Sequence, residues 1–345
     1  MNMCILCQIM DNKVENIKSI KEICTCKNRK FTEIPKELVG LEKLIIKTHP
    51  ITEIPREFTK LKYIGCYNTN IKEIPKEFVN LEELCCADSM FIDKLPKELV
   101  KLMKLVCCNT NIKEIPKEFI NLEELYCADS MFIKKLPKEL VKLRILDCCD
   151  TNIKEIPREF VRLETLACYT TDIAEIPKQF VNLQELNCVF TDVTCIPKEL
   201  VNLVTINCSS CNFLADIPEE LTNLVRLCIS YCPLITKIPR FTKLNYLECK
   251  GNVNLVDIIA NDDKDMLMID CDDCPNLTFA PLHLIKNQET LNIIDKNYQK
   301  YRKEGCKKLV FTILEELIER TWKPERARDW CWDEEEKKFM NEMIS

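Results

Sequence analysis

Apolar residues recur along most of the chain with a period of 20 or 21 residues. In the copy that begins at Leu61, counted as position 1, apolar side chains stand at positions 4, 6, 11, 14 and 18, and Pro75 follows at position 15. Self-similarity at a short fixed period is the signature of a repeat architecture. We therefore expect one repeat array over residues 20–285 in place of two globular domains. An Ile-Pro or Leu-Pro dipeptide marks the successive copies, at Pro35, Pro55, Pro75, Pro96, Pro116, Pro137, Pro157, Pro177, Pro197, Pro218 and Pro239.

Each copy predicts one short strand followed by a non-helical return. Positions 3 to 7 alternate between outward and inward side chains, as in a β-strand, and the strands of successive copies would pair as a parallel sheet. Proline at position 15 removes a backbone donor and fixes φ, which favours an extended or 3₁₀ return over an α-helix. Since one copy is too small to bury its own apolar residues, the copies must stack into a solenoid.

The repeated residues resemble the leucine-rich repeat family in its short class of 20 to 21 residues, which contains Leu-Pro-x-x-Leu. The resemblance implies an α/β repeat solenoid, a curved array with a concave parallel sheet on which a protein partner is generally held. Position 9, an Asn that bridges turns in the family, is Thr, Ser or Cys in most copies. We expect a poorer hydrogen-bond ladder there, because a hydroxyl has one donor and a thiol is a weak one. Position 6 departs from leucine as well, and is cysteine at Cys66, Cys86, Cys107, Cys127, Cys148, Cys168, Cys188, Cys208, Cys249 and Cys271.

Both ends of the array require caps, because an open solenoid end exposes apolar residues and an unpaired edge strand. We assign residues 1–19 to an N-terminal cap and residues 286–345 to a C-terminal helical cap or tail. Apolar residues from Leu309 to Trp322 follow the helical period, and this helix would stop before Pro324. The tail holds all three Trp, which would pack the cap or form a second docking motif. It is faintly similar to C-terminal segments of repeat proteins from large cytoplasmic DNA viruses, which would place the protein in a host cytoplasm.

Composition argues against several classes of function. Four Gly in 345 residues cannot form the Gly-rich loop of a nucleotide site, and a net charge of −6 disfavours nucleic acid as a partner. No apolar run approaches the roughly 20 residues that span a bilayer. Two His leave little material for acid–base chemistry. We expect a monomer with no enzymatic activity, no cofactor and no affinity for membranes.

The 24 Cys, together with an N-terminus that carries no secretory signal, predict free thiols in a reducing, cytoplasmic compartment. At position 6 the cysteines are expected to serve as small buried hydrophobic residues. The alternative use of thiols is a zinc site made by Cys4, Cys7, Cys24 and Cys26, since four thiolates can close a tetrahedron. Against it, Cys26 is placed at position 6 of a first, degenerate copy. The zinc question stays open.

Positions 2, 3, 5, 7 and 8 would face outward on the concave sheet, where exposed aromatic residues are the usual anchors of a protein interface. Residues 68–108 and 109–149 agree at 35 of 41 positions, and four of the six differences fall on these outward positions, which favours a face altered for binding. We therefore expect a protein-interaction module. The alternative is a substrate receptor of a ubiquitin ligase, with the C-terminal tail as its recruiting segment. The predicted partner-binding residues are aromatic along the array and acidic at its C-terminal end: Tyr67, Tyr126, Tyr169, Phe190, Tyr231, Glu248, Asp270, Asp272 and Asp273.

Overall fold

The structure is a computed structural model that describes residues 5–11, 16–25, 31–47, 49–259, 268–271, 273, 274 and 276. The chain divides into two compact units, residues 1–280 and residues 281–345, and every described residue belongs to the first. The expected C-terminal cap and its helix therefore lie outside the described residues.

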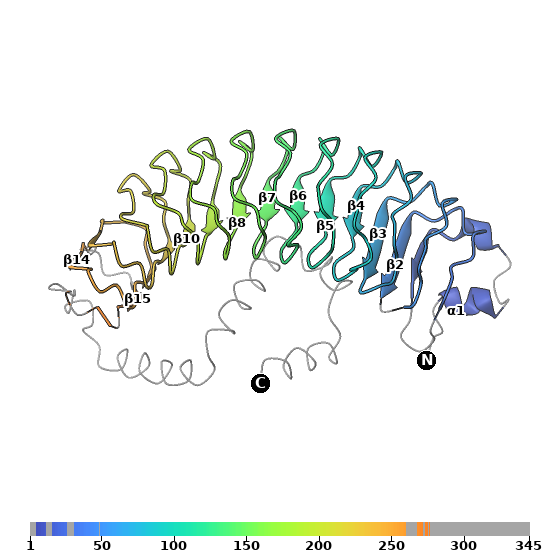
Figure 1. Ribbon diagram of the computed structural model, residues 1–345, viewed down its shortest axis with the longest axis horizontal. Helices are drawn as coiled ribbons and strands as arrows, with labels where there is room; N and C mark the ends of the chain where they lie inside the picture. The colour runs from blue at the N-terminus through green and yellow to red at the C-terminus, as the bar shows by residue number, and fades with distance from the viewer. Residues whose placement is uncertain are drawn as a thin grey trace. The chain divides into compact units, whose positions relative to one another are not determined.

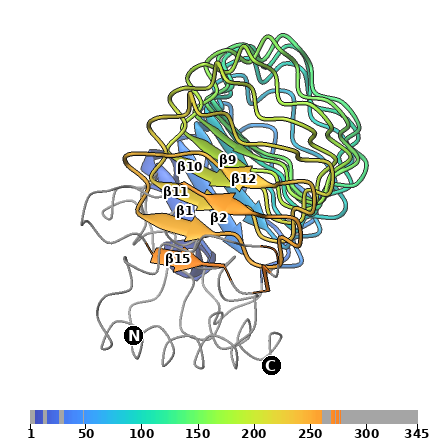
Figure 2. The same cartoon turned by 90° about the vertical axis from the view of Figure 1, so that its left-hand side faces the viewer.

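The first unit is a stack of turns that contribute one strand each to a parallel sheet. The sheet has 13 strands, paired in the order β1-β2-β3-β4-β5-β6-β7-β8-β9-β10-β11-β13-β15. In Figure 1 these strands lie side by side on the inner side of the arc formed by the described turns, and Figure 2 shows the returning segments on the opposite side of the coil. The expected solenoid with a concave parallel sheet is confirmed. The strands are β1 (Glu22–Cys24), β2 (Lys43–Lys47), β3 (Tyr63–Tyr67), β4 (Glu83–Cys85), β5 (Lys104–Val106), β6 (Glu124–Tyr126), β7 (Ile145–Asp147), β8 (Thr165–Ala167), β9 (Glu185–Asn187), β10 (Thr205–Asn207), β11 (Arg226–Cys228), β13 (Tyr246–Glu248) and β15 (Met268–Asp270), with β12 (Lys237–Ile238) and β14 (Asp257–Ile258) paired in a second sheet.

The register places equivalent residues of successive turns on top of one another. Leu84 of β4 pairs with Leu105 of β5, which pairs with Leu125 of β6, and all three are buried. Below the sheet, position 18 carries buried phenylalanines in several turns, each of which stabilises the stack by about 1.5–3 kcal/mol. Turns are numbered here from the residue at position 1: turns 1 to 11 begin at Leu41, Leu61, Leu81, Leu102, Leu122, Leu143, Leu163, Leu183, Leu203, Leu224 and Leu244.

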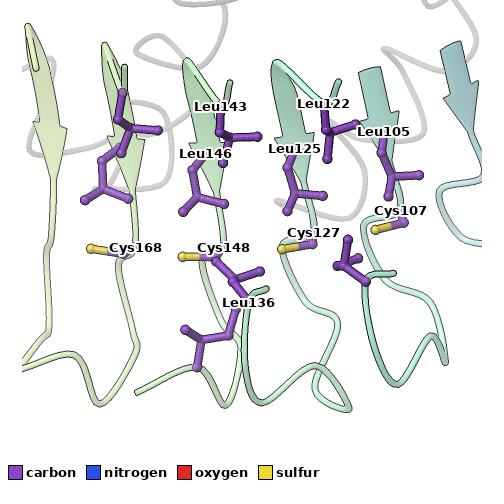
Figure 3. Packing of buried hydrophobic residues seen from close by; sticks show 14 of the residues in the cluster. Leu105, Cys107, Leu122, Leu125, Cys127, Leu136, Leu143, Leu146, Cys148 and Cys168 are labelled. Carbon is purple, nitrogen blue, oxygen red and sulfur yellow. The ribbon is translucent and has the colours of Figure 1, made fainter. Parts of the chain in front are cut away.

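The position-6 cysteines form a column of thiols inside the stack. Figure 3 shows Cys107, Cys127, Cys148 and Cys168 beneath the leucines of neighbouring turns. Nine of the ten are fully buried, and Cys271 is half-buried. Burial raises the pKa of the Cys127 and Cys148 thiols well above the ordinary value, so these groups stay protonated. The prediction that they act as small hydrophobic residues agrees with this environment.

The return segments close with short, 3₁₀-type hydrogen bonds. In turn 4, the Phe119 N–H donates to the Pro116 carbonyl (3.2 Å), and the Leu122 N–H, which starts the next turn, donates to the Phe119 carbonyl (2.9 Å). Both bonds span three residues, the spacing of a 3₁₀ turn rather than of an α-helix. The proline at position 15 thus contributes its carbonyl as an acceptor, and neither of these hydrogen bonds requires the N–H that proline lacks.

The position-9 ladder is continuous only in part. Ser89 Oγ reaches the Cys66 carbonyl of the preceding turn (2.6 Å), and Asn252 Nδ2 reaches the Ile229 carbonyl (2.9 Å). The Thr151 hydroxyl instead donates to the Cys148 carbonyl of its own turn (2.6 Å), and Thr171 and Thr191 do the same in theirs.

A second ladder, which the sequence analysis missed, bridges turns at position 20. Asn121 Nδ2 donates to the Val100 carbonyl one turn back (2.8 Å), and Lys142 Nζ one turn ahead donates to Asn121 Oδ1 (2.7 Å). Asn182 and Asn202 make the same backward bond where the inner ladder has threonine. Surface amides therefore supply part of the bridging between turns that position 9 lacks.

The N-terminal end differs from the prediction in its register. Because Cys24 of β1 pairs with Ile45 of β2, position 6 of the first copy is Thr25, which is buried, and the placement of Cys26 there was wrong. Helix α1 (Ile5–Met10) buries Leu6 and Cys7 in the same apolar cluster as β1, and η1 (Ile17–Ser19) follows it.

In the described part of the chain, no helix has the length and hydrophobicity needed to cross a membrane.

Candidate binding face

The outward face of the sheet is one continuous surface that extends beyond the strands. The Cys86 N–H, at position 6, donates to the Val106 carbonyl of the next turn (2.8 Å), and the Asp88 N–H, at position 8, donates to the Cys108 carbonyl (3.0 Å). The parallel hydrogen-bond ladder thus runs through position 8. We call positions 2, 3, 5, 7 and 8 of all turns the binding face; it lies on the inner side of the arc (Figure 1).

Position 8 has a left-handed backbone, which turns its side chain outward. Regular alternation would direct this residue towards the core, but φ is between 48° and 59° in turn after turn. Asn and Asp tolerate this conformation, whereas bulky residues rarely adopt it. Phe190 (φ 55°) and Tyr231 (φ 57°) are the bulky exceptions. The whole row is Asn68, Asp88, Asn109, Asp129, Asp150, Thr170, Phe190, Ser210 and Tyr231, continued by Gly251 and Asp273.

Phe190 and Tyr231 are also well exposed. Phe190 is 65% exposed, the largest fraction of any large apolar residue among those described, and Tyr231 is 53% exposed. The ring of Tyr231 lies over Gly251, where a Cβ would come within 2.5 Å of the ring atoms Cδ1 and Cε1. The next turn therefore needs glycine, with its φ of 68°, to leave room for this ring.

The other three predicted aromatic residues are less available. Tyr67 and Tyr126 are half-buried, and each carries a lysine over its ring: Lys47 Nζ lies 5.7 Å from the Tyr67 centroid and Lys104 Nζ 5.2 Å from that of Tyr126. The two lysines thus form cation–π contacts with these rings inside the protein, which leaves the ring faces less available to a partner. Tyr169 is half-buried as well.

Two aromatic residues of the binding face escaped the sequence analysis. The Tyr63 hydroxyl lies 3.3 Å from the Tyr67 hydroxyl, and Gly65 stands between the two rings. Tyr246 stacks under the guanidinium of Arg226, 4.4 Å from its ring centroid. Both tyrosines occupy position 3, one of the outward positions, so the repeat frame contained the signal that would have found them.

The predicted acids at the C-terminal end are partly compensated. Glu248 accepts hydrogen bonds from Ser230 Oγ (3.1 Å) and from the Tyr246 hydroxyl (3.1 Å), and Asp270 pairs with Lys250 (3.5 Å). Asp273 is exposed, and Asp272 lies outside the described residues.

A denser group of acids, outside the predicted partner-binding set, lies in turns 3 to 6. Desolvation raises the pKa of Asp129, and the neighbouring Asp88 raises it further. Desolvation and then Asp129 likewise raise the pKa values of Asp150 and Asp147. None of these four carboxylates forms an ion pair with a described Lys or Arg. We call Asp88, Asp129, Asp147 and Asp150 the acidic group.

Turns 8 and 9 present amides in place of carboxylates. Asn207 Oδ1 accepts hydrogen bonds from the Ser209 N–H (3.2 Å) and hydroxyl (3.0 Å), and Asn187 Oδ1 accepts from the Val189 N–H (3.5 Å). Because a backbone N–H must meet the oxygen, the Nδ2 donors of both amides are left to face away from the backbone. Within the described chain, neither Nδ2 group donates a hydrogen bond.

Comparison with known proteins matches this architecture. A sequence model of the Leucine Rich Repeat family matches residues 202–224, and no curated protein matches the chain. The functional domain of InlJ from Listeria monocytogenes, described as including a cysteine ladder, superposes with a TM-score of 0.63 at 21% identity, over 73% of this chain and 62% of that one. The fold is that of the leucine-rich repeat proteins.

Two further solved structures with the leucine-rich repeat fold are similar. YopM from Yersinia enterocolitica has a TM-score of 0.56 at 20% identity, over 74% of this chain and 61% of that one. LIC12759 from Leptospira interrogans has a TM-score of 0.51 at 21% identity, over 72% of this chain and 75% of that one. The chain thus spans less than two thirds of the InlJ domain and of YopM. Leucine-rich repeat proteins generally act as protein-interaction modules.

The remaining thiol question concerns metal. Cys7 is buried in the core and Cys24 is exposed on β1, while Cys4 and Cys26 lie outside the described residues. Within the ranges that the structure describes, no group of three or more His, Cys, Asp or Glu side chains is arranged to hold a metal ion.

Proposed function

We propose that this protein is a non-enzymatic scaffold that holds a protein partner on its binding face, with Phe190 and Tyr231 as the main anchors. The observation that carries the proposal is their combination of exposure and backbone conformation. Left-handed backbone costs roughly 1–2 kcal/mol for an ordinary residue, and this chain places two large rings there and leaves more than half of each in solvent. The folded protein gains little from such an arrangement, whereas an aromatic anchor for a partner gains a fixed, pre-ordered position.

The proposal revises which aromatic residues matter. Tyr67 and Tyr126 lie under lysines of the same chain, so they shape the face and contribute less to binding than the two exposed rings. The expectations of a monomer in a reducing, cytoplasmic compartment belong to the same proposal. A role as ubiquitin-ligase receptor depends on residues 286–345, outside the described part, and no contact among the described residues favours it.

The test compares which partners three proteins capture from the source cells. The first protein is the wild type, and the second is the Phe190→Ser/Tyr231→Ser variant. The third is a control in which Lys72, Lys113 and Lys154 on the returning segments are changed to Ser. Lys113 and Lys154 form only exposed pairs with Asp93 and Asp172, so the control should fold normally.

The wild type and the control are expected to retain the same partners, and the aromatic variant to lose them while its circular dichroism stays unchanged. Capture that is kept by the folded aromatic variant and lost by the control would place binding on the opposite side of the solenoid and contradict the proposal.

A further inference from the structure

The binding face changes character along the array. Turns 3 to 6 carry the acidic group, which lacks ion pairs with the described Lys and Arg. Turns 8 to 10 carry the outward amides of Asn187 and Asn207 and the exposed rings of Phe190 and Tyr231. Between the two rings, turn 9 has the small Ser210 at position 8. One end of the face therefore attracts positive charge, and the other offers apolar contact with hydrogen-bond donors.

Three of the four acids and both rings lie in a single line across the strands. Asp88, Asp129, Asp150, Phe190 and Tyr231 all occupy position 8, so the row that holds the acids also holds the rings. A line of contact points, one for each turn, suits a linear ligand better than a rounded protein surface. Asp88, Asp129 and Asp150 stand in turns 3, 5 and 6, so their charge is spread along the line.

We infer that the partner contributes an extended segment that crosses the strands, with a basic stretch over the acidic group and an apolar side chain between Phe190 and Tyr231. The inference rests on the proposed function, since it names the chemistry of the partner for the same face. Charge complementarity selects the basic stretch, because cationic side chains gain most where carboxylates have no cationic partner among the described residues; Asp88 and Asp147 accept only neutral hydrogen bonds, from Asn109 Nδ2 (2.8 Å) and from the Cys149 N–H (3.2 Å). The outward Nδ2 donors of Asn187 and Asn207 suit the main-chain carbonyls of such a segment.

The dimensions set the length of the segment. Neighbouring strands are about 4.8 Å apart, so Asp88 in turn 3 and Tyr231 in turn 10 are separated by roughly 34 Å along the sheet. An extended chain advances about 3.3 Å per residue, so about ten residues cover this distance. The acidic group spans turns 3 to 6, the midpoint of that span lies between turns 4 and 5, and the gap between the rings lies at turn 9. The apolar residue should therefore stand about six or seven residues from the middle of the basic stretch, at roughly 3.3 Å per residue.

The test is a selection of peptides from a random dodecapeptide library displayed on phage, against the full-length protein. Affinities of the enriched peptides are then measured for the wild type, for Asp129→Asn/Asp150→Asn and for Phe190→Ser/Tyr231→Ser. Asn68 and Asn109 already occupy position 8 with the same backbone, so the Asn replacements fit the fold.

The wild type should enrich peptides with two or more Lys or Arg six or seven residues from an aliphatic or aromatic residue. Binding of these peptides should weaken at least tenfold in the Asp-to-Asn variant and should fall as salt rises. Enriched peptides that lack basic residues, or that bind the Asp-to-Asn variant as tightly, would overturn the inference and leave the scaffold proposal intact if they still need the two rings. Peptides indifferent to the rings, or no enrichment at all, would count against both.

Discussion

Replacing Phe190 by Asn should remove the proposed anchor with almost no change in the stability of the fold. Phe190 has a left-handed backbone and a side chain that is 65% exposed, so the substitution has two opposing effects on the free energy of unfolding. Asn adopts this conformation more readily, and part of the roughly 1–2 kcal/mol cost of left-handed backbone is relieved. The third of the ring that is buried is lost, which costs about 0.5–1 kcal/mol if full burial of Phe contributes about 1.5–3 kcal/mol.

The two terms nearly cancel, and the free energy of unfolding should stay within about 1 kcal/mol of the wild-type value. The matched control is Phe180→Ala, one turn earlier, which removes a ring that is fully buried at position 18. Loss of a buried Phe typically costs about 3–5 kcal/mol. The contrast between two phenylalanines ten residues apart separates an exposed anchor from a core residue.

Urea unfolding followed by far-ultraviolet circular dichroism measures both variants. Tryptophan fluorescence is unsuitable, because all three Trp lie between residues 322 and 332, outside the repeats. A loss above about 2 kcal/mol for Phe190→Asn would show that the ring stabilises the fold through packing, and the reasoning from exposure and backbone strain would be refuted.

Two further predictions concern ionisable groups that are half-buried or buried. Desolvation raises the pKa of the half-buried Asp147 above its unfolded value, so the carboxylate destabilises the fold at neutral pH. Asp147→Asn, which copies Asn207, should raise the urea midpoint at pH 7, and this gain should vanish as the pH falls through the folded pKa to below about 3.9. A midpoint that is unchanged or lower at pH 7 would contradict the prediction. For the thiols, Ellman's reagent at pH 8 should label the exposed Cys24 and Cys195 far faster than the buried position-6 cysteines such as Cys148, whose pKa is raised by burial. The Cys24→Ser/Cys195→Ser variant should lose two rapidly reacting thiols, and an unchanged fast phase would contradict the assignment of rapid labelling to these two exposed cysteines.

The sequence by itself determined the solenoid, its parallel sheet and most of its core. Leu84, Leu105 and Leu125 share position 4 of their copies, and the structure stacks them as the period predicts. The physical reason is that one period supplies both the strand and the return, so equivalent residues of successive copies meet. At the ends the copies degenerate, and there a period alone misplaced Cys26 by one residue from the buried position that Thr25 fills.

Only the tertiary structure decided which outward side chains are free to bind. Tyr67 and Phe190 are both aromatic residues at outward positions, yet Lys47 of the preceding turn covers the ring of Tyr67 while no large side chain hides Phe190. In the same way Asp270 meets Lys250 of the turn before it, whereas Asp129 faces other carboxylates. Each such neighbour stands about 20 residues away in the sequence. The period says which residues face outward, but the charge and exposure of each one depend on the side-chain directions of two or three adjacent turns, and these follow from packing across the stack.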